Sequence, residues 1–253
     1  MTKEPPVTEK YYAGVYWRGR KESVAECARR AERYFRLVAP LDSTWAHWFR
    51  KADTLEKSLA SRVVPTASAF EELLARKEHR LLDGYMLSLW NGEHSGAVSQ
   101  FSDATMTNFS CGHASRFTPN VCILNPPAPG DGPAGERIVS ASTMTQVLRA
   151  MALAWDPDRG VVISESYRDQ TWPDKLPPAL VGWVTYLSRR RGTVPPLPAP
   201  VRVEPVEDLG TLITLTPERF TVDNPAHVEL AHHIRQILDQ AGLLGPEQFT
   251  ASD

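Results

Sequence analysis

The segment that most constrains the fold lies near the N-terminus, where a strand pattern runs directly into a helix pattern. Residues Tyr11–Trp17 are aromatic, small or β-branched, which is typical of a β-strand, and a turn follows at Gly19. From Ser23 to Val38 apolar residues recur at helical spacing. A strand followed by an amphipathic helix needs a layer for each to pack against, so the sequence favours an α+β fold.

Length and composition exclude several classes of protein. The chain has 253 residues, 42% of them hydrophobic, which suffices for a sizeable packed core. A formal charge of −2 provides no basic field for general nucleic-acid binding. Three cysteines form no disulfide framework, and no apolar run reaches the ~18 residues of a membrane span. We expect a cytoplasmic protein with reduced thiols and no secretory signal.

The remaining chain predicts more strands in its middle and a helix at its end. Strands are predicted near 85–90, 98–111, 121–124, 161–164, 182–187 and 211–215, with Asn91-Gly92 as a hairpin turn. Helices are predicted near 43–49, 67–76 and 143–155 and from Pro225 to Gly242, with a capping box at Thr143. Consecutive strands favour a mostly antiparallel or mixed central sheet flanked by helices. One domain is expected over 10–245, with a proline-rich connector at 194–200 and tails at 1–9 and 246–253.

Two motifs match known binding sites by letter but lack their context. Gly130–Gly135 fits the dinucleotide fingerprint, yet prolines crowd the loop and no helix is expected before about Thr143. Cys111, His113 and Cys122 would supply three zinc ligands, but no Cys-x-x-Cys pair is present. We interpret the first as a surface loop and the thiols as buried core residues. No cofactor and no metal are expected.

An acidic pair provides the strongest enzymatic hypothesis. Asp158 and, seven residues later, Glu165 at a strand end resemble the acidic half of a restriction-type nuclease site that holds Mg²⁺. Tyr167 stands where the lysine of such a site would follow. A metal-dependent hydrolase or degenerate nuclease that uses this pair is therefore an alternative, and no catalytic residue is assigned.

Two further features have both a structural and a functional interpretation. The run Arg189–Arg191 is typical of a solvated element end, and alternatively of a contact with an anion or an acidic partner. Trp172 lies in a polar segment, where it either folds back onto the core or anchors an interface. Surface acids, individually ordinary, are Glu93, Asp103, Asp131, Glu165, Asp169 and Asp174.

Four blocks of sequence resemble the immunity protein 52 family of bacterial polymorphic toxin systems. These blocks are residues 11–23 with 26–30, 39–45 with Trp48-Phe49, 88–92, and 154–162, and the similarity extends from about Tyr11 to Leu187. The resemblance implies a cytoplasmic protein, not an enzyme, that binds and neutralises a cognate toxin encoded next door. Such toxins are commonly restriction-endonuclease-like nucleases delivered by type VI or contact-dependent secretion. The family supplies no catalytic residues and no agreed contact residues.

The resemblance and the surface acids together give a prediction for the contact. A nuclease cleft attracts phosphate, so carboxylates beside an aromatic anchor are suited to fill it. The predicted partner-binding residues are Glu165, Asp169, Trp172, Asp174, Glu93 and Asp103. We expect no direct nucleic-acid or membrane contact. A secretion-system adaptor is the other alternative.

Overall fold

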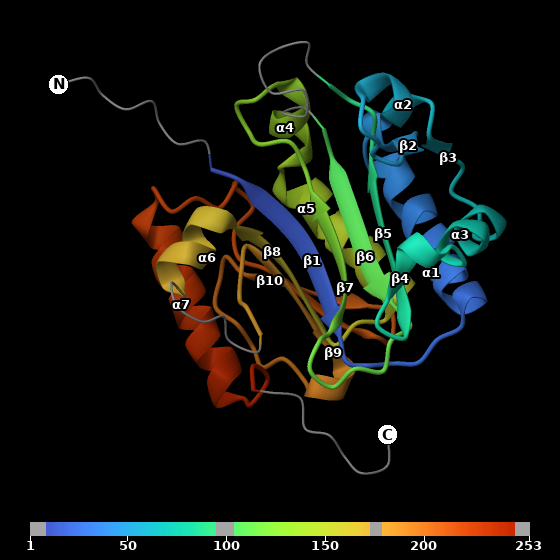
Figure 1. Ribbon diagram of the computed structural model, residues 1–253. Helices are drawn as coiled ribbons and strands as arrows, with labels where there is room; N and C mark the ends of the chain where they lie inside the picture. The colour runs from blue at the N-terminus through green and yellow to red at the C-terminus, as the bar shows by residue number, and fades with distance from the viewer. Residues whose placement is uncertain (1–8, 95–103, 173–178, 246–253) are drawn as a thin grey trace.

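The computed structural model describes residues 9–94, 104–172 and 179–245 and is built on one large sheet (Figure 1). Its strands are β1 Tyr11–Trp17, β2 Trp48–Phe49, β3 Arg62–Val63, β4 Arg80–Leu81, β5 Gly84–Trp90, β6 Met106–Cys111, β7 Asn120–Asn125, β8 Arg159–Ser164, β9 Val184–Ser188, β10 Arg202–Val206 and β11 Gly210–Thr214. They lie in the order β10-β11-β9-β8-β1-β7-β6-β5-β2-β3, with β4 paired to β5. All pairings among these described strands are antiparallel, so the predicted α+β class and sheet are confirmed.

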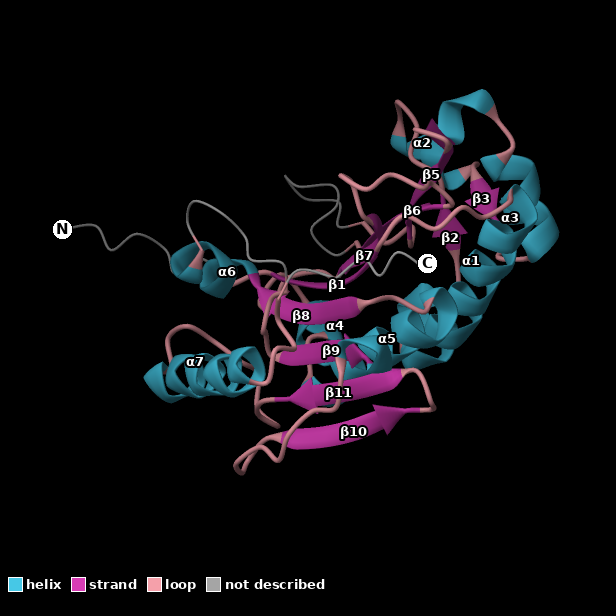
Figure 2. Cartoon of the chain, turned by 90° about the horizontal axis from the view of Figure 1, so that it is seen from below, coloured by secondary structure: helices cyan, strands magenta, loops and turns pink. Residues whose placement is uncertain are grey.

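The helices cover the sheet on two sides. They are α1 Val24–Val38, α2 Leu55–Leu59, α3 Ala67–Leu74, α4 Pro133–Ile138, α5 Ala141–Trp155, α6 Glu165–Thr171 and α7 Pro225–Gln240, with short 3₁₀ turns at Ala39–Leu41, Ser43–Trp45, Lys77–His79 and Arg189–Arg191. Helices α1 and α5 pack on each other, and α5 also contacts β1, β8 and β9. Helices α6 and α7 lie side by side beyond the end of β8, away from α1 (Figures 1 and 2).

The N-terminal strand and helix form as their sequence predicts. Strand β1 pairs with β7 on one edge and β8 on the other, and its Ala13, Val15 and Trp17 are buried. Ser23 caps α1 in a capping box with Glu26, with the Ser23 backbone N–H donating to Glu26 Oε2 at 2.7 Å. The apolar stripe of α1 lies in the same buried cluster as the sheet and α5. The central layer therefore follows from local sequence signals.

Several predicted element boundaries are wrong for identifiable reasons. Trp48 and Phe49 form strand β2 rather than part of a helix, because Asp42 caps only a single 3₁₀ turn that ends at Trp45. Asn91-Gly92 is no tight hairpin turn, since the Asn91 N–H donates to the carbonyl of Thr105 at 3.1 Å and a long connection separates β5 from β6. The part of the predicted strand region at 98–103 lies outside the described residues.

Three helix starts and one strand also differ from the predictions. Ser140, not Thr143, caps α5, and α4 begins at Pro133 inside the glycine-rich loop, earlier than expected. Ser164 caps the helix α6, which the sequence interpretation treated as a strand end and loop. Strand β10 was missed because it contains Pro205, and it forms the edge of the sheet, where a proline is tolerated.

The tails are predicted at 1–9 and 246–253, and residues 1–8 and 246–253 lie outside the described residues. Glu9 is held by the folded chain, because its Oε1 accepts a hydrogen bond from the Val222 N–H at 3.3 Å. Across the described ranges, every helix falls short of the length and apolarity that a bilayer crossing requires.

Candidate functional site

The acidic pair that suggested a nuclease site is not assembled in the structure. Asp158 precedes β8 and Glu165 follows it, so the strand holds them about 20 Å apart at ~3.3 Å per residue. Asp158 is buried and accepts hydrogen bonds from the Arg18 backbone N–H at 2.8 Å and from Arg190 Nε at 3.2 Å. The two carboxylates cannot share one metal ion. Asp158 instead links β1 to the turn that follows β9.

The arginine run stabilises the fold at two of its three positions. Arg190 donates to Asp156 and Asp158, and Arg191 donates to the carbonyls of Leu243 and Gly245 at 2.9 and 2.6 Å. Positive charge beside the C-terminal end of α5 suits the negative end of the helix dipole. Arg189 is exposed, 3.9 Å from Asp208. The solvated-end interpretation therefore fits one arginine, and the other two bind within the chain.

The cysteines and His113 belong to the core. Cys27, Cys111 and Cys122 are free and buried, and burial raises the pKa of the Cys122 thiol. His113 is also buried, and the loss of solvation lowers its pKa. Within the described part of the chain, no three His, Cys, Asp or Glu side chains form a metal-binding group. The interpretation of the thiols as buried core residues is confirmed.

Helix α6 brings together three of the six predicted partner-binding residues. Glu165 is its first residue, exposed Asp169 stands one turn later on the same face, and Trp172 ends the helix. Asp169 Oδ1 accepts a hydrogen bond from Arg168 Nε at 2.8 Å. Glu93 is exposed and follows β5, at the same end of the strands as Glu165. Strand β5 lies four strand spacings, or roughly 19 Å, from β8. Asp103 and Asp174 lie outside the described residues.

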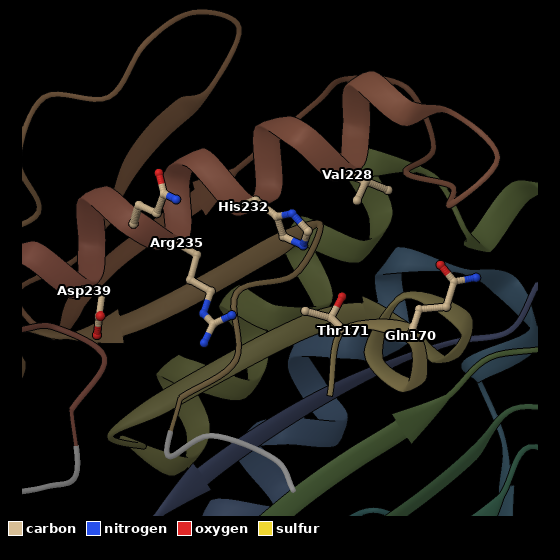
Figure 3. Close-up of a pocket in the computed structure, with 7 residues that line it drawn as sticks. Gln170, Thr171, Val228, His232, Arg235 and Asp239 are labelled. Carbon is tan, nitrogen blue, oxygen red and sulfur yellow. The ribbon is translucent and has the colours of Figure 1, made fainter. Parts of the chain in front are cut away.

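A groove of about 670 Å³ runs between α6 and α7. Figure 3 shows Arg235 and His232 on α7 facing Thr171 on α6, with Asp239 at the end of the row. The lining residues are Gln170, Thr171, Val228, His232, Arg235, Gln236 and Asp239. The groove therefore lies beside the helix that carries Glu165, Asp169 and Trp172.

Two aromatic side chains pack against residues that line this groove. The ring of Tyr167 packs edge-on against Trp172 with centroids 5.8 Å apart, and it lies 6.2 Å from the His232 ring. The guanidinium of Arg235 stacks over Trp172 at 5.2 Å from the ring centroid, a cation–π contact. Trp172 is partly buried against the core, as one of its two interpretations describes, and its role as an interface anchor stays a prediction.

Two buried hydrogen-bond donors close to the groove have no acceptor. The Tyr167 hydroxyl and the Trp172 indole N–H are buried and make no hydrogen bond with any described residue. Burial raises the pKa of Tyr167, and the Thr171 hydroxyl and the Arg235 charge oppose the rise, which places both groups near its oxygen. Buried polar groups are normally paired, and unpaired ones call for an explanation. These donors make the groove the candidate functional site.

A second exposed surface lies at the opposite end of the strands, where β5 begins and β6 ends. We call it the hairpin edge: Leu82, at the tip of the β4–β5 hairpin, and Phe117, in the β6–β7 loop, are 62% and 98% exposed. The two segments are joined by the Ala114 N–H, which donates to Asp83 Oδ1 at 3.2 Å. Arg116 and Lys21 add positive charge. Unlike the groove, this surface is open.

Sequence reasoning named residues of α6 as contact candidates but not the residues of α7 that face them. His232 and Arg235 lie on the exposed side of α7, and no local pattern says that this side faces Thr171 and Trp172. The exposed Phe117 was missed because a lone phenylalanine in a loop gives no periodic signal.

A solved structure shares the overall fold of this chain. A solved structure described as "Pseudomonas aeruginosa T6SS protein PA0821" matches with a TM-score of 0.52 at 13% identity, and the match covers 99% of this chain and 80% of that chain. At this identity the likeness concerns the fold alone. No curated protein sequence shows significant similarity to the chain.

The family follows from the sequence model. The model described as immunity protein 52 matches residues 9–247, which is nearly the whole chain. The chain therefore belongs to the immunity protein 52 family, and the predicted resemblance is confirmed.

Proposed function

We propose that this chain is a cytoplasmic immunity protein that neutralises a toxin encoded beside it by stoichiometric binding, without turnover. The observation that carries the proposal is membership of the immunity protein 52 family over residues 9–247. The separation of Asp158 from Glu165 by the length of β8 weighs against the hydrolase alternative. The fold shared with a "T6SS protein" supports a type VI route for the toxin.

The toxin contacts the α6 end of the molecule. Glu165 and Asp169 place two carboxylates on one face of α6, and Trp172 provides a large aromatic side chain beside them. Acids of this kind suit the phosphate-attracting cleft of a nuclease. A stable contact buries ~800 Å² per partner, a patch roughly 32 Å across, so Glu93 falls within reach at its rim. Asp103 and Asp174 belong to the same proposal.

Co-expression with the product of the neighbouring gene tests the function. The chain is expected to restore growth of cells that carry the toxin and to form a 1:1 complex on a sizing column. Failure of both would remove the proposal, and a stable complex with a component of the secretion apparatus instead would favour an adaptor. Turnover of any substrate, lost on changing Asp158 or Glu165, would favour the enzyme.

Charge reversal tests the position of the contact. Reversing Glu165, Asp169 and Asp174 together is expected to weaken toxin binding. The matched control reverses Asp53, Glu56 and Glu71, three exposed acids near α2 and α3. Equal binding by both triple variants would contradict the placement at α6.

A further inference from the structure

The groove between α6 and α7 contains donors that the protein itself does not use. Among the described residues, Arg235 forms no ion pair and no hydrogen bond, and its guanidinium stacks over Trp172. The Tyr167 hydroxyl and the Trp172 indole N–H, on side chains that contact His232 and Arg235, are buried behind the lining and are also unpartnered. Arg235 is therefore the charged donor that the groove presents without an acceptor.

Such an arrangement is unfavourable in the free protein. A buried donor without a partner loses its hydrogen bonds to water and gains none in return. An arginine held over an aromatic ring is partly desolvated and keeps its charge at every physiological pH. The cost at Arg235 is recovered when an acceptor enters the groove.

We propose that this groove binds the carboxylate of an aspartate or glutamate side chain of the toxin. The inference rests on the proposed function, because it takes the toxin as the partner. Arg235 supplies the charge and a planar pair of donors, and the Thr171 hydroxyl and the Gln236 amide are placed along the walls. In the complex, the acids of α6 contact basic residues of the toxin, and the groove binds one acidic side chain of the toxin.

The charges favour a carboxylate over a phosphate. The groove has one arginine, and its other donors are neutral apart from His232. Asp239 also lines the groove, one turn beyond Arg235 on α7, and forms no ion pair with it in the described structure. A single negative charge is matched by Arg235, whereas a dianion would meet repulsion from Asp239. The volume of about 670 Å³ admits one side chain with its backbone.

Arg116 provides the matched control. It is exposed on the hairpin edge and, like Arg235, forms no ion pair or hydrogen bond within the described chain. It lacks the groove, the stacked ring and the buried donors. Exposed charges in open solvent contribute little to binding. The same substitution at the two arginines therefore separates recognition in the groove from a general effect of charge.

Titration calorimetry with the full chain and an inactive variant of the neighbouring toxin tests the proposal. Arg235→Glu is expected to weaken binding by ~100-fold or more, because it removes the partner of a desolvated charge and adds repulsion. Arg235→Lys is expected to lose ~10-fold, since lysine keeps the charge but not the planar pair of donors. Arg116→Glu is expected to change binding by less than ~3-fold. Circular dichroism verifies that each variant is folded.

The acid on the toxin is found by changing its surface Asp and Glu residues one at a time to lysine. One such variant is expected to bind the wild-type chain poorly and to recover binding to Arg235→Glu, as a coupled pair does. If the wild-type chain binds the toxin and Arg235→Glu binds it equally well, this proposal is overturned while the proposed function stands. Loss of binding on Arg116→Glu alone would move the contact to the hairpin edge. If the wild-type chain does not bind the toxin, the proposed function itself has failed.

Discussion

Replacing Tyr167 with phenylalanine is expected to make the free protein more stable, which is unusual for a change in the core. The substitution removes one buried hydroxyl that has no hydrogen-bond partner. The ring contacts are kept, including those with Trp172 at 5.8 Å and Phe220 at 5.0 Å. Leaving a buried polar group unsatisfied costs about 1–3 kcal/mol, so removal of this oxygen should raise the free energy of unfolding by about 1–2 kcal/mol.

The size of the effect is within reach of differential scanning calorimetry. For a chain of this length each kcal/mol shifts Tm by about 2–4 °C, so Tm should rise by about 2–8 °C. Tyr11→Phe is the matched control, because the Tyr11 hydroxyl donates to the Phe220 carbonyl at 2.6 Å. Losing that hydrogen bond should lower the free energy of unfolding by about 1 kcal/mol. The two substitutions are chemically identical and should act with opposite sign.

A fall in Tm, similar to that of Tyr11→Phe, would refute the reasoning: it would mean that the Tyr167 hydroxyl is hydrogen-bonded within the protein and is not available to a partner.

Three further predictions concern the stability of the fold. Burial alone would raise the pKa of Asp42, but hydrogen bonds from Arg137 at 2.6 and 3.0 Å and from Thr44 hold it below its ordinary value. Arg137→Ala should therefore cost about 1–2 kcal/mol at pH 7, with Arg137 half exposed, and the difference should be lost in urea titrations as the pH falls through the lowered pKa of Asp42. Gly135→Ala would place a Cβ 2.1 Å from the backbone oxygen of Ala128 and should cost about 1–3 kcal/mol by thermal unfolding; an unchanged Tm would contradict this packing. Asp158→Asn should lower the free energy of unfolding by about 2 kcal/mol and leave toxin neutralisation intact, and loss of neutralisation in a folded variant would contradict its structural role.

Local signals in the sequence were sufficient for the central layer of the fold. The strand at Tyr11–Trp17, the capping box at Ser23 and the Asn224-Pro225 helix start all depend on residues within a few positions of each other. The predictions failed where a distant contact decides the outcome. Phe49 is drawn into a strand by pairing with Trp90, and Asn91 is held by Thr105 rather than by a tight turn.

Of the candidate site, only the residues at α6 could be predicted from the sequence, and those of α7 could not. A polar segment with a large aromatic pointed to Trp172, and the acids of α6 were named from composition. Arg235 and His232 follow more than fifty residues later, and long-range contacts, of Tyr167 with His232 and of Arg235 with Trp172, bring the two segments together. Periodicity shows which side of α7 is buried, but it does not say what lies across from the other side.

The central position of β1 has a consequence for synthesis on the ribosome. This apolar strand emerges before both of its neighbours, and its neighbour β8 begins about 140 residues later, an interval on the order of 10 s at ~5–20 residues per second. Until β7 and then β8 arrive, one or both of its hydrogen-bonding edges stay open to other nascent chains. The yield of soluble protein should therefore respond more strongly to translation speed and chaperone supply than the stability of the finished molecule would suggest.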